Sequence, residues 1–193
     1  GDEAVKIGWE NRIADGDLSN VSSIHIGAHV GTHLDMPLHF IDGAANLDDL
    51  DLSLMIGLVI VVEVPEEKTS IDADFLEELG LKNVTRLLFK TANSKMWDDP
   101  SLSFVTDYVA LEGGAAQWLV DHGCRLVGID YLSIAPYDDS TTPHEILLSN
   151  NVVIIETLDL RDVEPGDYEL ICLPLKLISR EAAPVRAILR RTP

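Results

Sequence analysis

Eleven consecutive residues, from His29 to His39, carry the side chains of this chain that are best suited to chemistry. They read His-Val-Gly-Thr-His-Leu-Asp-Met-Pro-Leu-His, so three of the six histidines and one carboxylate fall within one short segment. Imidazole nitrogen and carboxylate oxygen are ligand types that divalent zinc and manganese favour. We interpret the segment as a metal centre, and open positions on the ion would suit a hydrolytic reaction.

The spacing of the candidate ligands predicts how they converge. Gly31 and Pro37 argue against a helix, and in an extended chain alternate side chains face the same side. The candidate ligands all have odd numbers: His29, His33, Asp35 and His39. Gly31 would allow an unusual turn, and Thr32 is expected to hydrogen-bond a ligand and fix its orientation. For His39 two roles stay open, a further ligand or a general acid and base.

A second pair of candidates lies far along the chain. Thr142, Pro143 and Glu145 have the pattern of a helix start with a capping box. His144 would then lie at the positive end of the helix dipole, which favours its neutral, ligating form. Glu156 ends an otherwise apolar strand, where a carboxylate is often a site residue.

The elements that must position these residues alternate along the second half of the chain, which predicts an α/β fold with a mixed sheet in a single domain, residues 1–193. Apolar runs predict strands at residues 22–28, 57–64, 86–90, 125–129, 152–156, 168–173 and 184–189. Helices are expected at residues 70–79, with Ser70 or Asp72 as N-cap, at residues 111–122, and from Thr142 onward. The long loops at residues 40–54 and 92–107 are candidates for lining a site.

Composition excludes several classes of protein. The formal net charge of −19 argues against binding nucleic acid or an anionic membrane, and no apolar run approaches the roughly 18 residues of a membrane span. Cys124 and Cys172 adjoin predicted buried strands outside any metal-binding or redox motif, so we expect core cysteines in a reducing cytoplasm. His25 and His122 are expected to be structural.

The segment from His29 to His39 resembles the signature of the putative cyclase family, which includes bacterial kynurenine formamidases and isatin hydrolases. The resemblance extends over roughly residues 20–190. It includes the segments 126–131, 165–176 and 183–189, and the spacing of His144 from Glu156. It implies a metal-dependent amidohydrolase with the swivelling β/β/α fold, assembled as a homodimer or homotetramer. It also implies a further N-terminal strand and loop ahead of Gly1.

The resemblance also implies roles for the candidate residues. The first ion would be held by His29, His33 and Asp35. A second ion would be held by His144 and Glu156, with Asp35 able to bridge. The resemblance assigns the part of catalytic acid and base to His39. The implied cofactor is one or two Zn²⁺ ions, with Mn²⁺ as the alternative.

The expected substrate is a small-molecule aryl formamide such as N-formylkynurenine, which would be cleaved to kynurenine and formate. The alternatives are a cyclic amide, imide or lactone, as for isatin hydrolases, or a non-catalytic metal-binding protein. Phe40, Trp97 and Tyr131 are candidates for packing an aromatic substrate. Lys90 and Lys95 are the candidates for binding its carboxylate.

Overall fold

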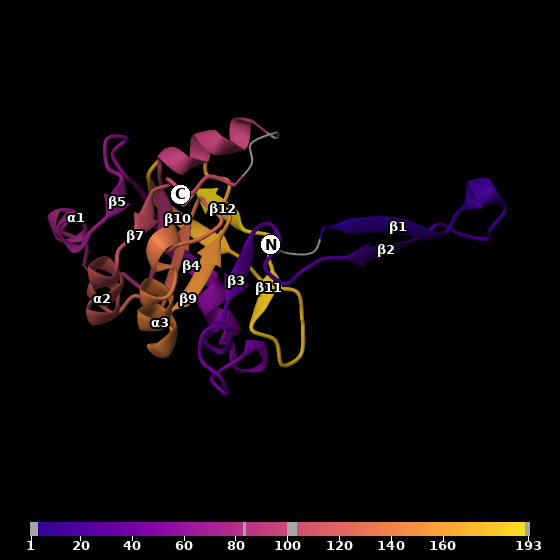
Figure 1. The fold of residues 1–193 in the computed structure, drawn as a ribbon, viewed down its shortest axis with the longest axis horizontal. Coiled ribbons are helices and arrows are strands. Elements are labelled where there is room, and N and C mark those ends of the chain that lie inside the picture. Colours follow the sequence, from indigo (N-terminus) through magenta and orange to yellow (C-terminus); the bar gives the residue numbers. More distant parts are fainter. Residues whose placement is uncertain (1–3, 83, 100–103, 192–193) are drawn as a thin grey trace.

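A mixed sheet of eight strands carries three α-helices in the computed structural model, which describes residues 4–82, 84–99 and 104–191 (Figure 1). The strands of this sheet are β3 (His33–Asp35), β4 (Ile56–Glu63), β6 (Arg86–Lys90), β8 (Leu126–Ile129), β9 (Val153–Glu156), β10 (Gly166–Ile171), β11 (Ala182–Pro184) and β12 (Ile188–Arg191). Two smaller pairs are formed by β1 (Lys6–Asn11) with β2 (Val21–His25), and by β5 (Ser70–Ile71) with β7 (Ala110–Leu111). The helices are α1 (Ala73–Glu78), α2 (Gly113–Asp121) and α3 (Thr142–Ser149). Short 3-10 helical turns cover Ile13–Asp15, Pro37–His39, Leu47–Asp49, Leu52–Met55, Ala92–Asp98 and Tyr137–Asp139.

The strand order of the main sheet is β11-β3-β9-β8-β6-β4-β10-β12. The four inner strands β9, β8, β6 and β4 are parallel, and the outer strands pair antiparallel. The carboxyl ends of parallel strands meet at one edge of a sheet, where ligands of open α/β sheets usually bind. The predicted α/β fold with a mixed sheet is confirmed.

Two hydrophobic cores lie on the two faces of this sheet. The first packs alternate residues of the parallel strands, such as Phe89 and Ile154, against apolar residues of the helices, such as Leu119 and Leu147. The second core joins Leu34 of β3 to Leu170 of β10, although these strands are near opposite ends of the strand order. The sheet is therefore curled around its second core.

The β1–β2 hairpin projects away from the rest of the molecule (Figure 1). All its strand residues are exposed, and the paired Ile7 and Ile24 are 73% and 66% exposed. The alternation over residues 22–28 predicted a strand, which the structure confines to β2. Its apolar face is not buried by the chain's own core.

Three sequence predictions of local structure are corrected by the structure. The expected helix at residues 70–79 begins at Ala73, with Asp72 as N-cap, because residues 70–71 form β5 instead. Thr142 lies inside α3 and makes no capping box; its backbone N–H donates to the Asp139 side chain, 3.2 Å away. The single strand expected at residues 184–189 is divided between β11 and β12.

The helices at residues 111–122 and from Thr142 are present as α2 and α3. His122 caps α2 and stacks on Trp118, in agreement with a structural role, and Cys124 and Cys172 are buried. Within the described ranges, no helix is long and apolar enough to cross a membrane.

Candidate metal centre

The centre of the site is built by the pairing of β3 with β9. In this antiparallel pair His33 lies opposite Glu156, so the first residue of β3 meets the last residue of β9 at the carboxyl edge of the sheet. His33 and Asp35 are alternate residues of β3 and share one face. The side chains of His33, Asp35 and Glu156 are all buried, and Asp35 is fully buried.

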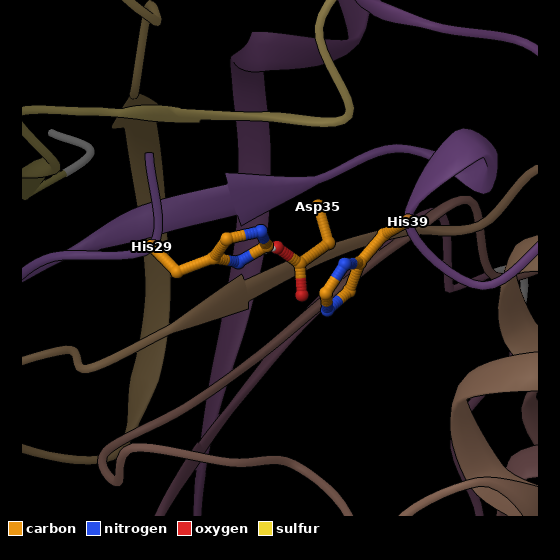
Figure 2. A group of neighbouring side chains, drawn as sticks. All are labelled: His29, Asp35 and His39. Atoms are coloured by element: carbon orange, nitrogen blue, oxygen red, sulfur yellow. Dashed lines mark ion pairs between the residues drawn. The ribbon is translucent and has the colours of Figure 1, made fainter. Parts of the chain in front are cut away.

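His29 and His39 reach the same place through turns rather than through an extended chain. Gly31 adopts φ +66°, a left-handed conformation that favours glycine, so the turn expected there is present. Residues 37–39 form a 3-10 turn that begins with Pro37. The predicted alternation therefore holds only within β3. Figure 2 shows the side chains of His29, Asp35 and His39 turned toward one another, and the ring centroids of the two histidines are 4.1 Å apart.

His144 joins the cluster from the first turn of α3. Its Nε2 lies 3.1 Å from Oε1 of Glu156, and its Nδ1 donates to the carbonyl of Ser140 at 2.7 Å. The ring of Phe40 stacks on it, with centroids 4.5 Å apart. The four candidates of residues 29–39 and the distant pair His144 and Glu156 thus meet in one cluster.

The buried polar atoms of this cluster fit a divalent ion. Nε2 of His33 and both carboxylate oxygens of Asp35 have no hydrogen-bond partner among the described residues, which is costly for buried groups. Ligand atoms of a tetrahedral zinc, at about 2.0–2.1 Å from the ion, are about 3.3 Å apart. The distances here are 3.0 Å from His29 Nδ1 to Asp35 Oδ1, and 3.5 Å from His33 Nε2 to both Asp35 Oδ1 and Glu156 Oε2.

Two groups of candidate ligand atoms share Asp35. Within each group the atoms all lie within 4.8 Å of one another, and the groups are His29, Asp35, His39 and His33, Asp35, Glu156. A carboxylate common to both groups could bridge two ions, as the resemblance implies. Because His39 belongs to the first group, the hypothesis that it is a metal ligand stays open.

Charge and burial shift the pKa values of the clustered residues in opposite directions. Burial alone lowers the pKa of His33, but Glu156 and Asp35 outweigh it and raise that pKa. The pKa of His144 is raised in the same way, against its burial, by Glu156. Burial raises the pKa of Glu156, but the two imidazoles lower it to about 2. Burial lowers the pKa of His39, with His29 and His144 adding to the effect, so His39 favours the neutral form.

Two neighbours of the ligands act on orientation. His33 Nδ1 donates to the carbonyl of Gly31 at 2.8 Å, which turns Nε2 toward the carboxylates. Thr32 was expected to hydrogen-bond a ligand, but its hydroxyl donates to the carbonyl of Thr157 at 2.7 Å. Thr32 therefore ties the turn to the end of β9 and supports the ligands only indirectly.

The three predicted substrate residues, Phe40, Trp97 and Tyr131, lie in different surroundings. Phe40 contacts both His39 and His144. Tyr131 is buried and its hydroxyl donates to the carbonyl of Val105, while the Trp97 indole donates to the carbonyl of Asp130. A part for Tyr131 or Trp97 in substrate binding stays a prediction.

The two lysines suggested for a substrate carboxylate line a different hollow. Lys90 donates to the carbonyl of Val163, and Lys95 pairs with Glu66. Both belong to a cavity of about 830 Å³ at the ends of β4 and β6, and the lining residues include none of the clustered ligands. The metal cluster, rather than this cavity, carries the candidate metal ligands and the candidate base.

One neighbour of the cluster gave no signal in the sequence. Oε1 of Glu181 lies 3.6 Å from Nε2 of His29. Glu181 stands just ahead of the apolar run at residues 184–189, like many surface acids of this chain. Only the pairing of β11 with β3 brings it to the site.

The fold and this cluster define an α/β protein with a candidate divalent-metal centre at the carboxyl edge of its sheet. The model of the family described as Putative cyclase matches residues 4–136. The chain belongs to the putative cyclase family, so the resemblance seen in the sequence is confirmed.

Two relatives show the range of this family. Cyclase-like protein 2 of Oryza sativa subsp. japonica is 42% identical over 188 residues, covering 92% of this chain and 67% of the relative. A kynurenine formamidase of Salinibacter ruber is 37% identical over 195 residues, covering 100% of this chain and 91% of the relative.

Solved structures show a similar fold. A structure described as a predicted metal-dependent hydrolase from Bacillus stearothermophilus is 31% identical, with a TM-score of 0.81 over 96% of this chain and 86% of that one. Isatin hydrolase A of Ralstonia solanacearum is 20% identical, with a TM-score of 0.82 over 96% of this chain and 81% of that one. At that identity the likeness concerns the fold alone.

Proposed function

We propose that the protein is a metal-dependent amidohydrolase that cleaves an aryl formamide such as N-formylkynurenine to kynurenine and formate. The observation that carries the proposal is the set of buried atoms on His33 and Asp35 that lack a hydrogen-bond partner among the described residues, which calls for a cation. Similarity to a kynurenine formamidase over the full length of the chain supports the choice of substrate. Zinc is the proposed ion, and manganese is the alternative.

The proposed ligand sets follow the resemblance, and the proposed base follows from the environment of His39. His29, His33 and Asp35 would hold one ion, and Asp35, His144 and Glu156 a second. A bound divalent ion supplies a Lewis acid for the amide carbonyl and lowers the pKa of water. His39 is the proposed general base, because its lowered pKa keeps the imidazole neutral and able to accept a proton. The protonated His39 then returns that proton to the leaving amine.

Phe40 has a supporting part in this proposal. Its ring contacts both the proposed base and a proposed ligand, 4.6 Å from the ring of His39 and 4.5 Å from that of His144. Apolar contact at this point reduces the access of bulk water to the imidazoles. An aryl substrate would find an aromatic neighbour there.

The experiment is hydrolysis of N-formylkynurenine by protein stripped of metal and reloaded separately with zinc and manganese. We expect release of kynurenine that depends on the added ion and is lost in His39→Ala. Stoichiometric metal binding without release from the formamide would contradict the proposed substrate. In that case isatin and simple lactones are the next substrates to assay.

We also propose that the chain assembles as a homodimer or homotetramer. The β1–β2 hairpin supports this proposal, because an isolated two-stranded hairpin is marginally stable in water. Ile7, Trp9 and Ile24 on this hairpin are each more than half exposed. A second copy packed on this face would bury them.

A further inference from the structure

Two of the clustered histidines are oriented by backbone carbonyls. Nδ1 of His33 donates to Gly31, and Nδ1 of His144 donates to Ser140, at 2.8 and 2.7 Å. In both rings this leaves Nε2 facing the carboxylates. A partner on the far nitrogen fixes both the tautomer and the angle of a ligating imidazole.

His29 is placed the other way round. Its Nδ1 faces Asp35 at 3.0 Å, and its Nε2 faces the carboxylate of Glu181 at 3.6 Å. The side chain of His29 is 24% exposed, against 3% for His33, so packing constrains its ring less. An orienting partner therefore matters more for His29 than for the buried His33.

The backbone holds Glu181 at this place. Ala182 pairs with Asp35 across β11 and β3, and the carbonyl of Glu181 accepts from the N–H of Met36 at 2.8 Å. The preceding carbonyl, of Arg180, accepts from the N–H of Leu47 at 3.0 Å. The side chain of Glu181 thus starts from a fixed backbone beside the proposed ligands. A small rotation, or one water, closes the remaining gap to His29.

We infer that Glu181 is a positioning residue for the metal centre: its carboxylate accepts the Nε2 proton of His29 and presents Nδ1 to the ion. This inference rests on the metal centre of the proposed function, but not on its substrate. It gives His29 a carboxylate in the place that backbone carbonyls take at His33 and His144. A carboxylate also raises the basicity of the ligating ring.

The competing explanation is that Glu181 acts only as one more negative charge, since its side chain is 34% exposed. A charge-only effect would be reproduced by removing another exposed acid close to the ligands in sequence. Asp42, an exposed residue three positions after His39, is the matched control. The variants are therefore Glu181→Ala, Glu181→Gln and Asp42→Asn.

The experiment measures zinc affinity of the full chain by chelator competition, without any substrate. We expect Glu181→Ala to weaken the site that contains His29 by about 10- to 100-fold, the usual effect of losing such a partner. Glu181→Gln keeps a carbonyl acceptor and should lose clearly less. Asp42→Asn should bind zinc as the parent does. In the zinc-loaded parent, NMR should show an Nε2 proton on His29 that exchanges slowly, and Glu181→Ala should lose it.

Three outcomes would overturn the inference. The first is zinc affinity in Glu181→Ala within about twofold of the parent. The second is a loss of the same size in Glu181→Ala, Glu181→Gln and Asp42→Asn, which would indicate an effect of charge alone. The third is a drop in thermal stability of the metal-free variant with unchanged affinity and an unchanged His29 proton. Failure to hydrolyse any formamide would contradict the substrate and leave these readouts intact.

Discussion

The ring of Phe40 lies flat on the ring of His144, with centroids 4.5 Å apart and an interplanar angle of 13°. His144 also donates to Ser140 and approaches Glu156. Three contacts therefore fix one imidazole whose Nε2 faces the cluster. The 3-10 turn that ends at His39 delivers Phe40 to this place, so one short segment serves both the proposed base and a distant ligand.

Replacing Phe40 should weaken binding of the ion that His144 is proposed to hold. Stacked aromatic pairs contribute about 0.5–1.5 kcal/mol, which corresponds to roughly 2- to 13-fold in affinity. We expect a loss of that size in Phe40→Ala, measured by chelator competition. Phe104→Ala, which removes an exposed aromatic ring elsewhere, is the control. Equal affinity in Phe40→Ala and the parent would show that the stack does not hold His144.

Removing the imidazole of His39 should separate catalysis from metal binding. General acid and base catalysis typically contributes 10²–10⁴-fold, so His39→Ala should lose about that much of kcat while keeping its metal. Metal content by elemental analysis and kcat on the formamide are the two measurements. Loss of an ion together with activity would make His39 a ligand, the reading that its group with His29 and Asp35 leaves open. His122→Ala, at the end of α2, should change neither quantity.

On acidification, the site should release zinc at a higher pH than a site with ordinary histidine ligands. The pKa values of His33 and His144 are raised above 6.5, so these rings become protonated at a pH where a free histidine is still mostly neutral. A protonated imidazole cannot bind an ion, and each such ring costs up to about tenfold in affinity per pH unit below its pKa. Zinc titrations from about pH 8 down to about pH 5 should therefore show affinity falling already above pH 6.5. A flat profile above that pH would contradict the raised values.

Local sequence patterns predicted the inner strands well, because a strand that is buried on both faces has a nearly continuous apolar run. The run at residues 86–90 became β6 with both ends as expected. The run at residues 184–189 failed for a reason of topology. It contains the end of β11 and the start of β12, which are the first and last strands of the sheet order. A local pattern cannot indicate that one apolar run serves both edges of a curled sheet.

For the candidate site, too, local features were predicted and long-range contacts were not. Ligand types and their clustering were visible from His29 to His39, because residue chemistry is local. The partners that orient these ligands come from elsewhere: Glu181 from the turn ahead of β11, and the N–H of Ile134, which donates to Glu156 at 2.7 Å. Such contacts depend on strand register and on loop paths, which residue types alone do not encode.

Asp130 should be important for stability although it lies outside the ligand cluster. This fully buried carboxylate follows β8 and accepts from the backbone N–H of Thr91, the hydroxyl of Thr91 and the hydroxyl of Ser94, all within 2.8 Å. Asp130→Ala leaves these donors unpaired at about 1–3 kcal/mol each, so we expect a loss of about 3 kcal/mol or more in the free energy of unfolding. Urea denaturation measures it. Asp130→Asn keeps one acceptor oxygen and should lose less, and a loss below about 1 kcal/mol in Asp130→Ala would contradict the role.

The β1–β2 hairpin should decide the assembly state. Ile7 and Ile24 are cross-strand partners, and Trp9 lies on the same face of β1 as Ile7. Burying this face against a second copy would remove apolar surface from water at about 25 cal/mol per Å². Light scattering should therefore show a dimer or tetramer for the parent, and smaller species for the double variant Ile7→Ser with Ile24→Ser at the same concentration.

Two further measurements make this test of assembly specific. The hairpin variant should keep its metal content, because the ligand cluster lies on β3, β9, α3 and their adjoining turns, outside the hairpin. Tyr137→Ser removes an exposed aromatic ring that belongs to a different surface, and it should leave the assembly unchanged. A parent chain that is monomeric at every concentration would refute the assembly proposal, and the exposed face of the hairpin would then need another partner.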